Sequence, residues 1–296
     1  MQWLCNSRRT LSQGIRKGKG VAMKKFEKKI ERYNARIDKF SGIDEMIRYI
    51  ESKPADDGWL ADTVNTKTLD ASFCGAKTYE SARDMLKKGV NVKDIITAIN
   101  TGKREYNKKQ NVRHVSGGAP CIPAAVANDP RGMYMKRREQ LTGAYNVYIN
   151  CNYLAGVRKS QVKDAGIEIL KEVLRVAAIK PVNLWCGTLA IDDDRRNIYG
   201  TAMQVIDAGK SFNAARVSYA LTEAGFLRVF GFACRERTGG FWSSSNQWGM
   251  GCTLAKYDAA LNKRVLNAAY KNMVCINITD VIDGRVDALK ELKAIK

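Results

Sequence analysis

The spacing of apolar positions predicts a small helical region within residues 41–115. Ser41, with Asp44 three residues later, forms a start that resembles a capping box. Two shorter helices are predicted over 79–88 and 92–100, because a glycine closes each apolar pattern. The positions that repeat at helical intervals after Ser41 are Ile43, Met46, Ile47 and Ile50.

After residue 145 the pattern alternates between strands and helices. Strands are predicted over 145–151, 181–191, 198–206, 226–234 and 273–278, and helices over 162–179, 211–224, 257–270 and 285–296. Such alternation indicates an α/β fold, with a mixed sheet flanked by helices. The predicted organisation is a basic segment over 1–40, a helical region over 41–115 and an α/β core over 116–296.

The basic residues are concentrated in two stretches. Residues 1–40 hold twelve basic and three acidic residues, and residues 103–138 hold nine basic and two acidic, so the two stretches carry +9 and +7 of the net +20. Such a concentrated basic charge typically binds a polyanion, most often a nucleic acid. The alternative is a solvated tail that only aids solubility. We expect a flexible basic arm followed by a charged helix over 23–40, because glycines interrupt the first part.

The second basic stretch is interrupted by a segment rich in proline and glycine, 116–133. Its composition predicts a fixed loop or a series of tight turns that presents the two halves of the stretch. The predicted nucleic-acid-binding residues in the two stretches are Arg8, Arg9, Arg16, Lys17, Lys19, Lys24, Lys25, Lys28, Lys29, Lys103, Arg104, Lys108, Lys109, Arg113, Lys136, Arg137 and Arg138.

A third candidate is the polar, glycine-rich segment 235–251. Its candidate residues are Arg235, Arg237, Phe241, Trp242 and Trp248. Exposed aromatic rings stack on unpaired bases while arginines contact phosphates, so this segment suits single-stranded nucleic acid. Alternatively, the aromatic residues fold back as a lid over the sheet.

The chain lacks the usual signatures of catalysis and of metal or cofactor binding. His114 is the only histidine, and no cysteine pair has Cys-x-x-Cys spacing. No Walker motif is present. The acidic run at 192–194 precedes two arginines and indicates a solvated turn more than a metal site. We therefore expect a non-enzymatic protein without metal or cofactor. No apolar run reaches membrane length, and no secretory signal is visible. Eight scattered cysteines, four of them in apolar strand-like runs, fit a reducing cytoplasm better than a disulfide framework, so we expect a cytoplasmic protein.

The segment from Tyr148 to Val157 resembles the opening of a von Willebrand A-type domain, whose first strand precedes a magnesium site. Here Asn150, Asn152 and Leu154 stand at the corresponding positions, so the resemblance implies the shape without the metal.

A second resemblance rests on the block 117–133 and on Lys180-Pro-Val-Asn-Leu-Trp, and spans roughly residues 40–235. These segments are similar to proteins of lytic tailed phages, and the whole pattern is most similar to Drc-type single-stranded-DNA-binding regulators. That resemblance implies binding of unpaired DNA in the host cytoplasm and a phage RNA polymerase as a partner.

Three functions remain open from the sequence. The first is a homo-oligomeric, sequence-tolerant protein that binds single-stranded DNA and acts in phage transcription or replication. The second is a virion or packaging protein that binds duplex DNA. The third is a nucleic-acid-processing enzyme whose site the sequence does not reveal.

Overall fold

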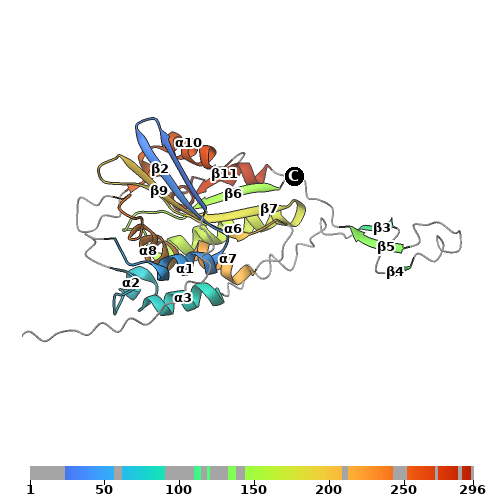
Figure 1. Ribbon diagram of the computed structural model, residues 1–296, viewed down its shortest axis with the longest axis horizontal. Coiled ribbons are helices and arrows are strands. Elements are labelled where there is room, and N and C mark those ends of the chain that lie inside the picture. Colours follow the sequence, from blue (N-terminus) through green and yellow to red (C-terminus); the bar gives the residue numbers. More distant parts are fainter. Residues whose placement is uncertain are drawn as a thin grey trace, which may run out of the picture.

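An eight-stranded mixed sheet organises the protein (Figure 1). The computed structural model describes residues 24–56, 62–90, 110–114, 119–120, 133–137, 144–208, 213–242, 252–270, 273–285 and 289–294. The sheet has the order β1-β2-β9-β7-β6-β11, with β8 beside β9 and β10 beside β8. Its strands are β1 (Lys24–Ile30), β2 (Tyr33–Phe40), β6 (Tyr145–Asn150), β7 (Val182–Gly187), β8 (Leu189–Ile191), β9 (Asn197–Ile206), β10 (Cys252–Thr253) and β11 (Met273–Asn277).

The strand directions follow from the pairing. Strands β6, β7 and β11 are parallel to one another, and β9 runs antiparallel to β7. Strand β2 is parallel to β9, and β1 is antiparallel to β2. Consequently β1, β6, β7 and β11 all begin at one end of the sheet, where β2 and β9 finish. We call this the entry end.

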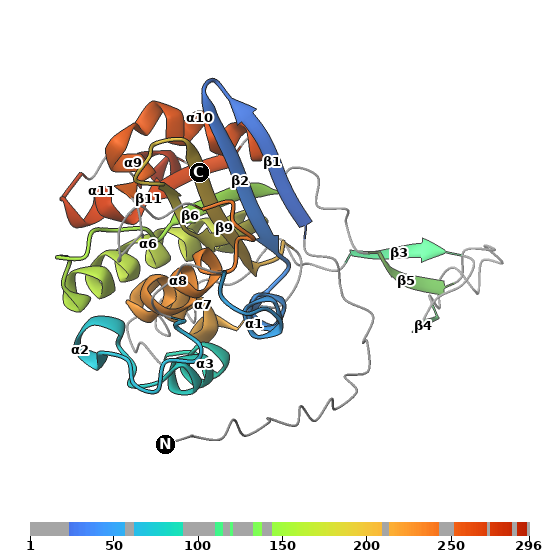
Figure 2. The same cartoon turned by 60° about the vertical axis from the view of Figure 1, so that its left-hand side comes forward.

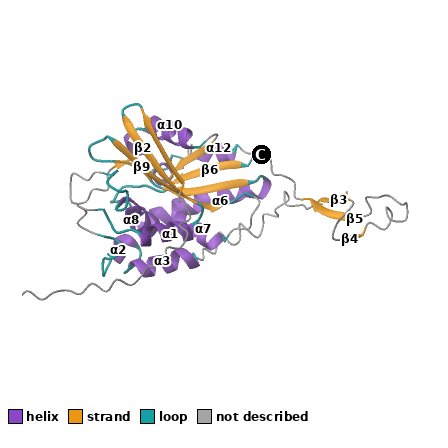
Figure 3. Ribbon diagram, in the orientation of Figure 1, coloured by secondary structure: helices purple, strands orange, loops and turns teal. Residues whose placement is uncertain are grey.

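Helices cover both faces of the sheet (Figures 1 and 3). The larger apolar cluster joins one face to most of the helices, and a smaller cluster joins the other face to α9 and α10. The helices are α1 (Ile43–Ser52), α2 (Ala71–Cys74), α3 (Tyr79–Lys88), α6 (Lys159–Ile179), α7 (Ala214–Thr222), α8 (Phe232–Arg235), α9 (Leu254–Tyr257), α10 (Ala259–Ala269), α11 (Ile278–Ile282) and α12 (Lys290–Lys293). This arrangement confirms the predicted α/β class.

A separate three-stranded antiparallel sheet has the order β3-β5-β4. Its strands are β3 (Gln110–His114), β4 (Ala119–Pro120) and β5 (Met133–Arg137). They come from the second basic stretch. Arg113 pairs with Tyr134, and Lys136 pairs with Asn111.

The predicted charged helix over 23–40 is wrong, because β1 and β2 form a hairpin there. Residues 24–40 are therefore part of the α/β sheet and not of a separate arm. Figure 2 shows β1 along the edge of the sheet beside β2. Phe26 and Ile30, four residues apart, lie on the same side of β1 and pack against the smaller apolar cluster. This spacing fits a strand, in which every second side chain points to the same face.

The predicted strand over 226–234 is also wrong. Residues Phe226–Gly231 form a π-helical turn that continues into α8. Every residue from Phe226 to Gly231 is buried, and the one charged residue, Arg228, donates hydrogen bonds to the carbonyls of Phe73, Ala155 and Val157. A continuous apolar run of this length does not distinguish a buried strand from a buried helix.

Other element boundaries differ by a few residues. The strand expected over 181–191 divides at Thr188 into β7 and β8, both antiparallel to β9. Helix α7 is capped by Asn213, two residues after the expected start at 211, and Asp258 separates α9 from α10. In place of the expected capping box, Ser41 donates hydrogen bonds from its backbone N and its Oγ to Glu45.

The expected C-terminal helix over 285–296 is described as α12 at 290–293. The helix expected over 92–100 lies outside the described residues.

Gly166 lets α6 and α7 approach closely. A Cβ atom at Gly166 would lie 2.1 Å from the backbone oxygen of Leu221. In an exposed helix, Gly166→Ala would stabilise by up to about 1 kcal/mol. Here we expect a net loss of about 1–3 kcal/mol in the free energy of unfolding, because the two backbones must separate. Urea unfolding measures whether the free energy of unfolding falls. A more stable variant would contradict the close approach of α6 and α7 at Gly166.

Candidate nucleic-acid interface

The edge strand β1 presents four exposed lysines. Lys24, Lys25, Lys28 and Lys29 all lie on this strand, and each is exposed. Because side chains alternate along a strand, Lys24 and Lys28 lie on one face and Lys25 and Lys29 on the other. We call this group the lysine edge.

Each face of β1 brings a lysine of the lysine edge close to a lysine from elsewhere in the chain. Lys24 pairs directly with Lys39 of β2. Burial, and then the charge of Lys24, lower the pKa of Lys39. On the other face, burial and then the charge of Lys25 lower the pKa of Lys53. Like charges placed opposite one another destabilise a sheet, so an anion bound along this edge would relieve the pair of Lys24 and Lys39.

A row of aromatic rings lies beside Lys39. Its Nζ atom lies 3.8 Å from the centre of the Tyr270 ring and 5.7 Å from the centre of the Phe26 ring. The Tyr270 and Trp185 rings follow, with their centres 5.7 Å apart. All three aromatic side chains are partly exposed. We call Phe26, Lys39, Tyr270 and Trp185 the aromatic row.

The aromatic row lies where α10 stops covering the sheet. Helix α10 ends at Ala269, whose carbonyl oxygen accepts a hydrogen bond of 2.8 Å from Lys39 Nζ. Beyond the helix, the strands keep one face partly exposed close to the entry end. Partly exposed rings next to lysines can contact both the bases and the phosphates of an unpaired strand.

Both basic stretches of the sequence join the sheet at its entry end. Residues 1–23, with five basic and no acidic residues, lead into β1 at Lys24. The second stretch leads into β6 at Tyr145. β1 and β6 begin at the same end of the sheet, so each basic stretch precedes in sequence a strand that starts at the entry end.

The structure places the predicted basic residues in three groups. The four lysines of β1 form the lysine edge. Arg113, Lys136 and Arg137 lie on strands of the small sheet. The others lie outside the described residues: Arg8, Arg9, Arg16, Lys17, Lys19, Lys103, Arg104, Lys108, Lys109 and Arg138.

Arg235 and Arg237 are inside the protein and not on an exposed loop. Both are almost fully buried, and burial lowers the pKa of Arg235 to about 10. Arg237 bonds to Asp62 at 2.5 Å and to Glu236 at 3.1 Å. It also donates a hydrogen bond from Nε to the carbonyl of Lys53. The expectation that these arginines contact phosphates is corrected, because both side chains are buried and Arg237 is held in ion pairs within the fold.

The lid interpretation is the one that fits Trp242. Its side chain is 3% exposed and belongs to the larger apolar cluster, where its ring meets Tyr199 edge-on. Phe241 is partly buried and packs against the same cluster. The prediction that Trp242 stacks on bases is therefore corrected. Trp248 lies outside the described residues.

Sequence reasoning missed Phe26, Lys39, Trp185 and Tyr270. The signal for Phe26 was present, since Phe26 and Ile30 are the apolar residues among the lysines of β1. This signal was missed because residues 23–40 were predicted as a helix, and a helix does not place Phe26 beside Lys39. Trp185 and Tyr270 carry no sequence signal, since their proximity comes from the order of the strands.

The asparagines after β6 form a closed hydrogen-bonded cluster. Asn150 Oδ1 accepts from the backbone N of Asn152 and of Leu189, and Asn152 Nδ2 donates to the carbonyl of Leu189. The described residues contain no group of three or more histidine, cysteine or acidic side chains placed to hold a metal. Asp192 accepts hydrogen bonds from Arg196 and Asn197, which supports the predicted turn.

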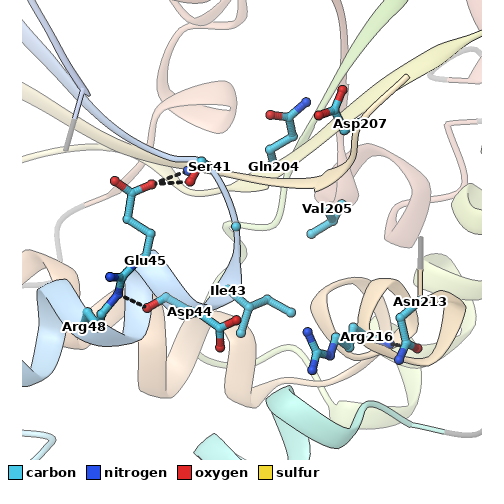
Figure 4. A pocket seen from close by; sticks show the side chains of 11 residues that line it. Ser41, Ile43, Asp44, Glu45, Arg48, Gln204, Val205, Asp207, Asn213 and Arg216 are labelled. Atoms are coloured by element: carbon cyan, nitrogen blue, oxygen red, sulfur yellow. Dashed lines mark hydrogen bonds between the residues drawn. The ribbon is translucent and has the colours of Figure 1, made fainter. Parts of the chain in front are cut away.

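A polar pocket of about 370 Å³ lies at the entry end, on the face opposite the aromatic row (Figure 4). The first turns of α1 and α7 and the last residues of β9 line it. Arg48 and Arg216 oppose Asp44, Glu45 and Asp207 around it, so its charges are mixed. Arg216 Nε donates to the carbonyl of Lys87. These contacts do not favour an anion over a cation.

Together, the fold and this interface define an α/β protein with a lysine-rich sheet edge next to partly exposed aromatic rings. No helix in the described part of the chain has the length and apolarity to cross a membrane. The family model "Domain of unknown function (DUF7192)" matches residues 21–293, so the protein belongs to this family. Neither the curated proteins nor the solved structures give a match.

Proposed function

We propose that this protein binds single-stranded DNA without catalysing a reaction on it. The observation that carries the proposal is the lysine edge beside the aromatic row: Lys24 opposes Lys39, and the Lys39 ammonium contacts the rings of Phe26 and Tyr270. Phosphates along the lysine edge would offset the like charges, and bases would stack on the rings. Stacking tolerates any base, so binding would be largely independent of sequence.

The aromatic row favours an unpaired strand over a duplex. A duplex hides the faces of its bases, so a protein that binds only its phosphates gains nothing from partly exposed rings. The two basic stretches, which precede β1 and β6 in the sequence, support the same proposal, because concentrated positive charge attracts a polyanion.

The cellular role we propose follows from the sequence resemblance of residues 40–235 to phage regulators. In that role the protein would coat unpaired DNA as a homo-oligomer in the host cytoplasm. It would bring a phage RNA polymerase to promoters or support replication. Light scattering with and without an oligonucleotide measures the self-association; a mass that stays at one chain per short strand would contradict it.

The proposal is tested with a labelled 30-mer, single-stranded and duplex, by fluorescence anisotropy across a salt series. We expect tighter binding of the single strand and a steep fall in affinity with salt. Equal affinity for both forms would favour a packaging role. No binding at moderate salt would overturn the proposal, and cleavage of the strand would favour an enzyme.

Trp185→Leu tests the stacking contribution. We expect the affinity for the single strand to fall about 5- to 100-fold, because stacking on an aromatic ring contributes about 1–3 kcal/mol per base. Duplex affinity should change little. Far-UV circular dichroism and urea unfolding show whether the variant remains folded. Equal losses for single strand and duplex in a folded variant would mean that Trp185 does not stack on bases.

A further inference from the structure

A second open depression, of about 490 Å³, lies under the other face of the β1–β2 hairpin. It is bounded by the segment Lys53–Asp56 and by Gly239 and Gly240, with buried Arg237 behind them. Its place is fixed by Arg36 of β2, which donates a hydrogen bond to the carbonyl of Thr238. The charge of Lys25 acts on Lys53 at its rim, so the depression adjoins the lysine edge.

The glycines make one side of this depression flat and open. Gly239 and Gly240 have φ angles of 69° and 76°, in the left-handed region that favours glycine. Among the residues that the structure describes, a Cβ atom on either glycine would meet no heavy atom within 4 Å. The described residues therefore leave the space at these two positions open, and a planar group can approach their backbone closely.

The walls of the depression are held in place by hydrogen bonds. Asp56 Oδ2 accepts from the backbone N of Gly240 at 3.0 Å and from Thr238 Oγ1 at 3.1 Å. Arg237 Nε donates to the carbonyl of Lys53 at 2.8 Å. The two segments are thus joined at both ends, and the site does not need a ligand to form.

The polar groups of the depression provide one donor and one acceptor next to apolar surface. The Lys53 ammonium can donate, the Asp56 carboxylate can accept, and Pro54 and Ala55 supply apolar contacts. The volume lies within the range of small-molecule sites, about 300–1,000 Å³. A nucleobase matches this description, because it is planar and carries donors and acceptors on one edge. Carboxylates accept from exocyclic amino groups such as that of cytosine.

We propose that this depression receives one base of the strand whose phosphates follow the lysine edge. It selects a base that carries an amino group beside an acceptor, such as cytosine, over thymine, which has no amino group. The inference rests on the proposed function and adds a modest base preference to binding that is otherwise electrostatic. A single hydrogen bond of about 1 kcal/mol corresponds to a preference of about fivefold.

The test compares 12-mers of deoxycytidine and thymidine by fluorescence anisotropy. The wild-type protein should bind the cytosine strand about fivefold more tightly. In Asp56→Asn the ratio should fall to one or below, because the asparagine oxygen can keep its bonds to the loop while its amide faces the base. Lys53→Met, which keeps the aliphatic stem, should also lower the ratio.

Lys25→Gln is the matched control on the same face of the hairpin. It should weaken binding of both strands equally and leave the ratio unchanged. Equal affinity of the wild-type protein for both strands would overturn the proposed binding of a base in the depression, but not the proposed function. A ratio unchanged in folded Asp56→Asn and Lys53→Met would do the same. Binding of neither strand would overturn both.

Discussion

Replacing Lys24, Lys25, Lys28 and Lys29 with glutamine should lower the affinity for single-stranded DNA about 10- to 100-fold at moderate salt. Each phosphate that a lysine neutralises releases counterions, and contributes about 0.7 to the slope of log affinity against log salt. The slope should therefore fall by about 3 when all four contacts are lost. Anisotropy titrations over a salt series measure both quantities.

The matched control removes the same charge from the opposite side of the sheet. Lys67, Lys77, Lys163 and Lys171 are exposed on the side that α6 and the helical region cover. Changing these four to glutamine gives the same net charge and should leave the salt slope close to that of the wild type. If both variants lose affinity equally, the net charge of the chain determines binding, and the lysine edge is not the interface.

Asp38→Ala should cost about 3–5 kcal/mol in the free energy of unfolding. Asp38 is fully buried, and its carboxylate accepts bonds of 2.9 Å from both Nε and a terminal nitrogen of Arg36. Tyr199 donates a further hydrogen bond to the same carboxylate. Although burial opposes the charged form, the hydrogen bonds and charge of Asp38 raise the pKa of Arg36. Without Asp38, that buried guanidinium is left with the exposed carboxylate of Glu27, 3.6 Å away, as a much weaker counter-charge.

Urea unfolding measures this loss, and two further variants show its cause. Arg36→Met combined with Asp38→Leu should lose much less stability than Asp38→Ala alone, because no buried charge remains. Asp44→Ala removes an exposed carboxylate of α1 and should have a small effect. A loss below about 1 kcal/mol in Asp38→Ala would show that the pair does not stabilise the fold.

The sequence predicted the α/β class because the later elements follow simple patterns. Strands β6, β9 and β11 and helices α3 and α6 match their apolar periodicities within a few residues. The hairpin of β1 and β2 was missed because lysines occupy both faces of β1. An edge strand needs few apolar residues, and Phe26 and Ile30 alone packed against the core give little periodic signal.

The candidate site was predicted only in part, for a related reason. The concentration of basic charge in the sequence selected the four lysines of the lysine edge. They are exposed in the structure, because one side of an edge strand has no neighbouring strand. Sequence reasoning also selected Arg235 and Arg237, because the sequence does not show that both are buried or that Arg237 pairs with Asp62 and Glu236. The aromatic row joins residues as distant in sequence as Phe26 and Tyr270, and only the strand order brings them together.

The pairing of β2 with β9 has a consequence for how the chain folds. Asn34 and Asn197 meet in this pair although 163 residues separate them. A two-stranded hairpin is at best marginally stable alone. During synthesis, the backbone groups along the edges of β1 and β2 therefore stay unpaired until β9 has been made. Charged residues on such an edge discourage pairing with other chains. The lysines of β1 are therefore suited to protect the nascent hairpin from aggregation, before any nucleic acid is bound.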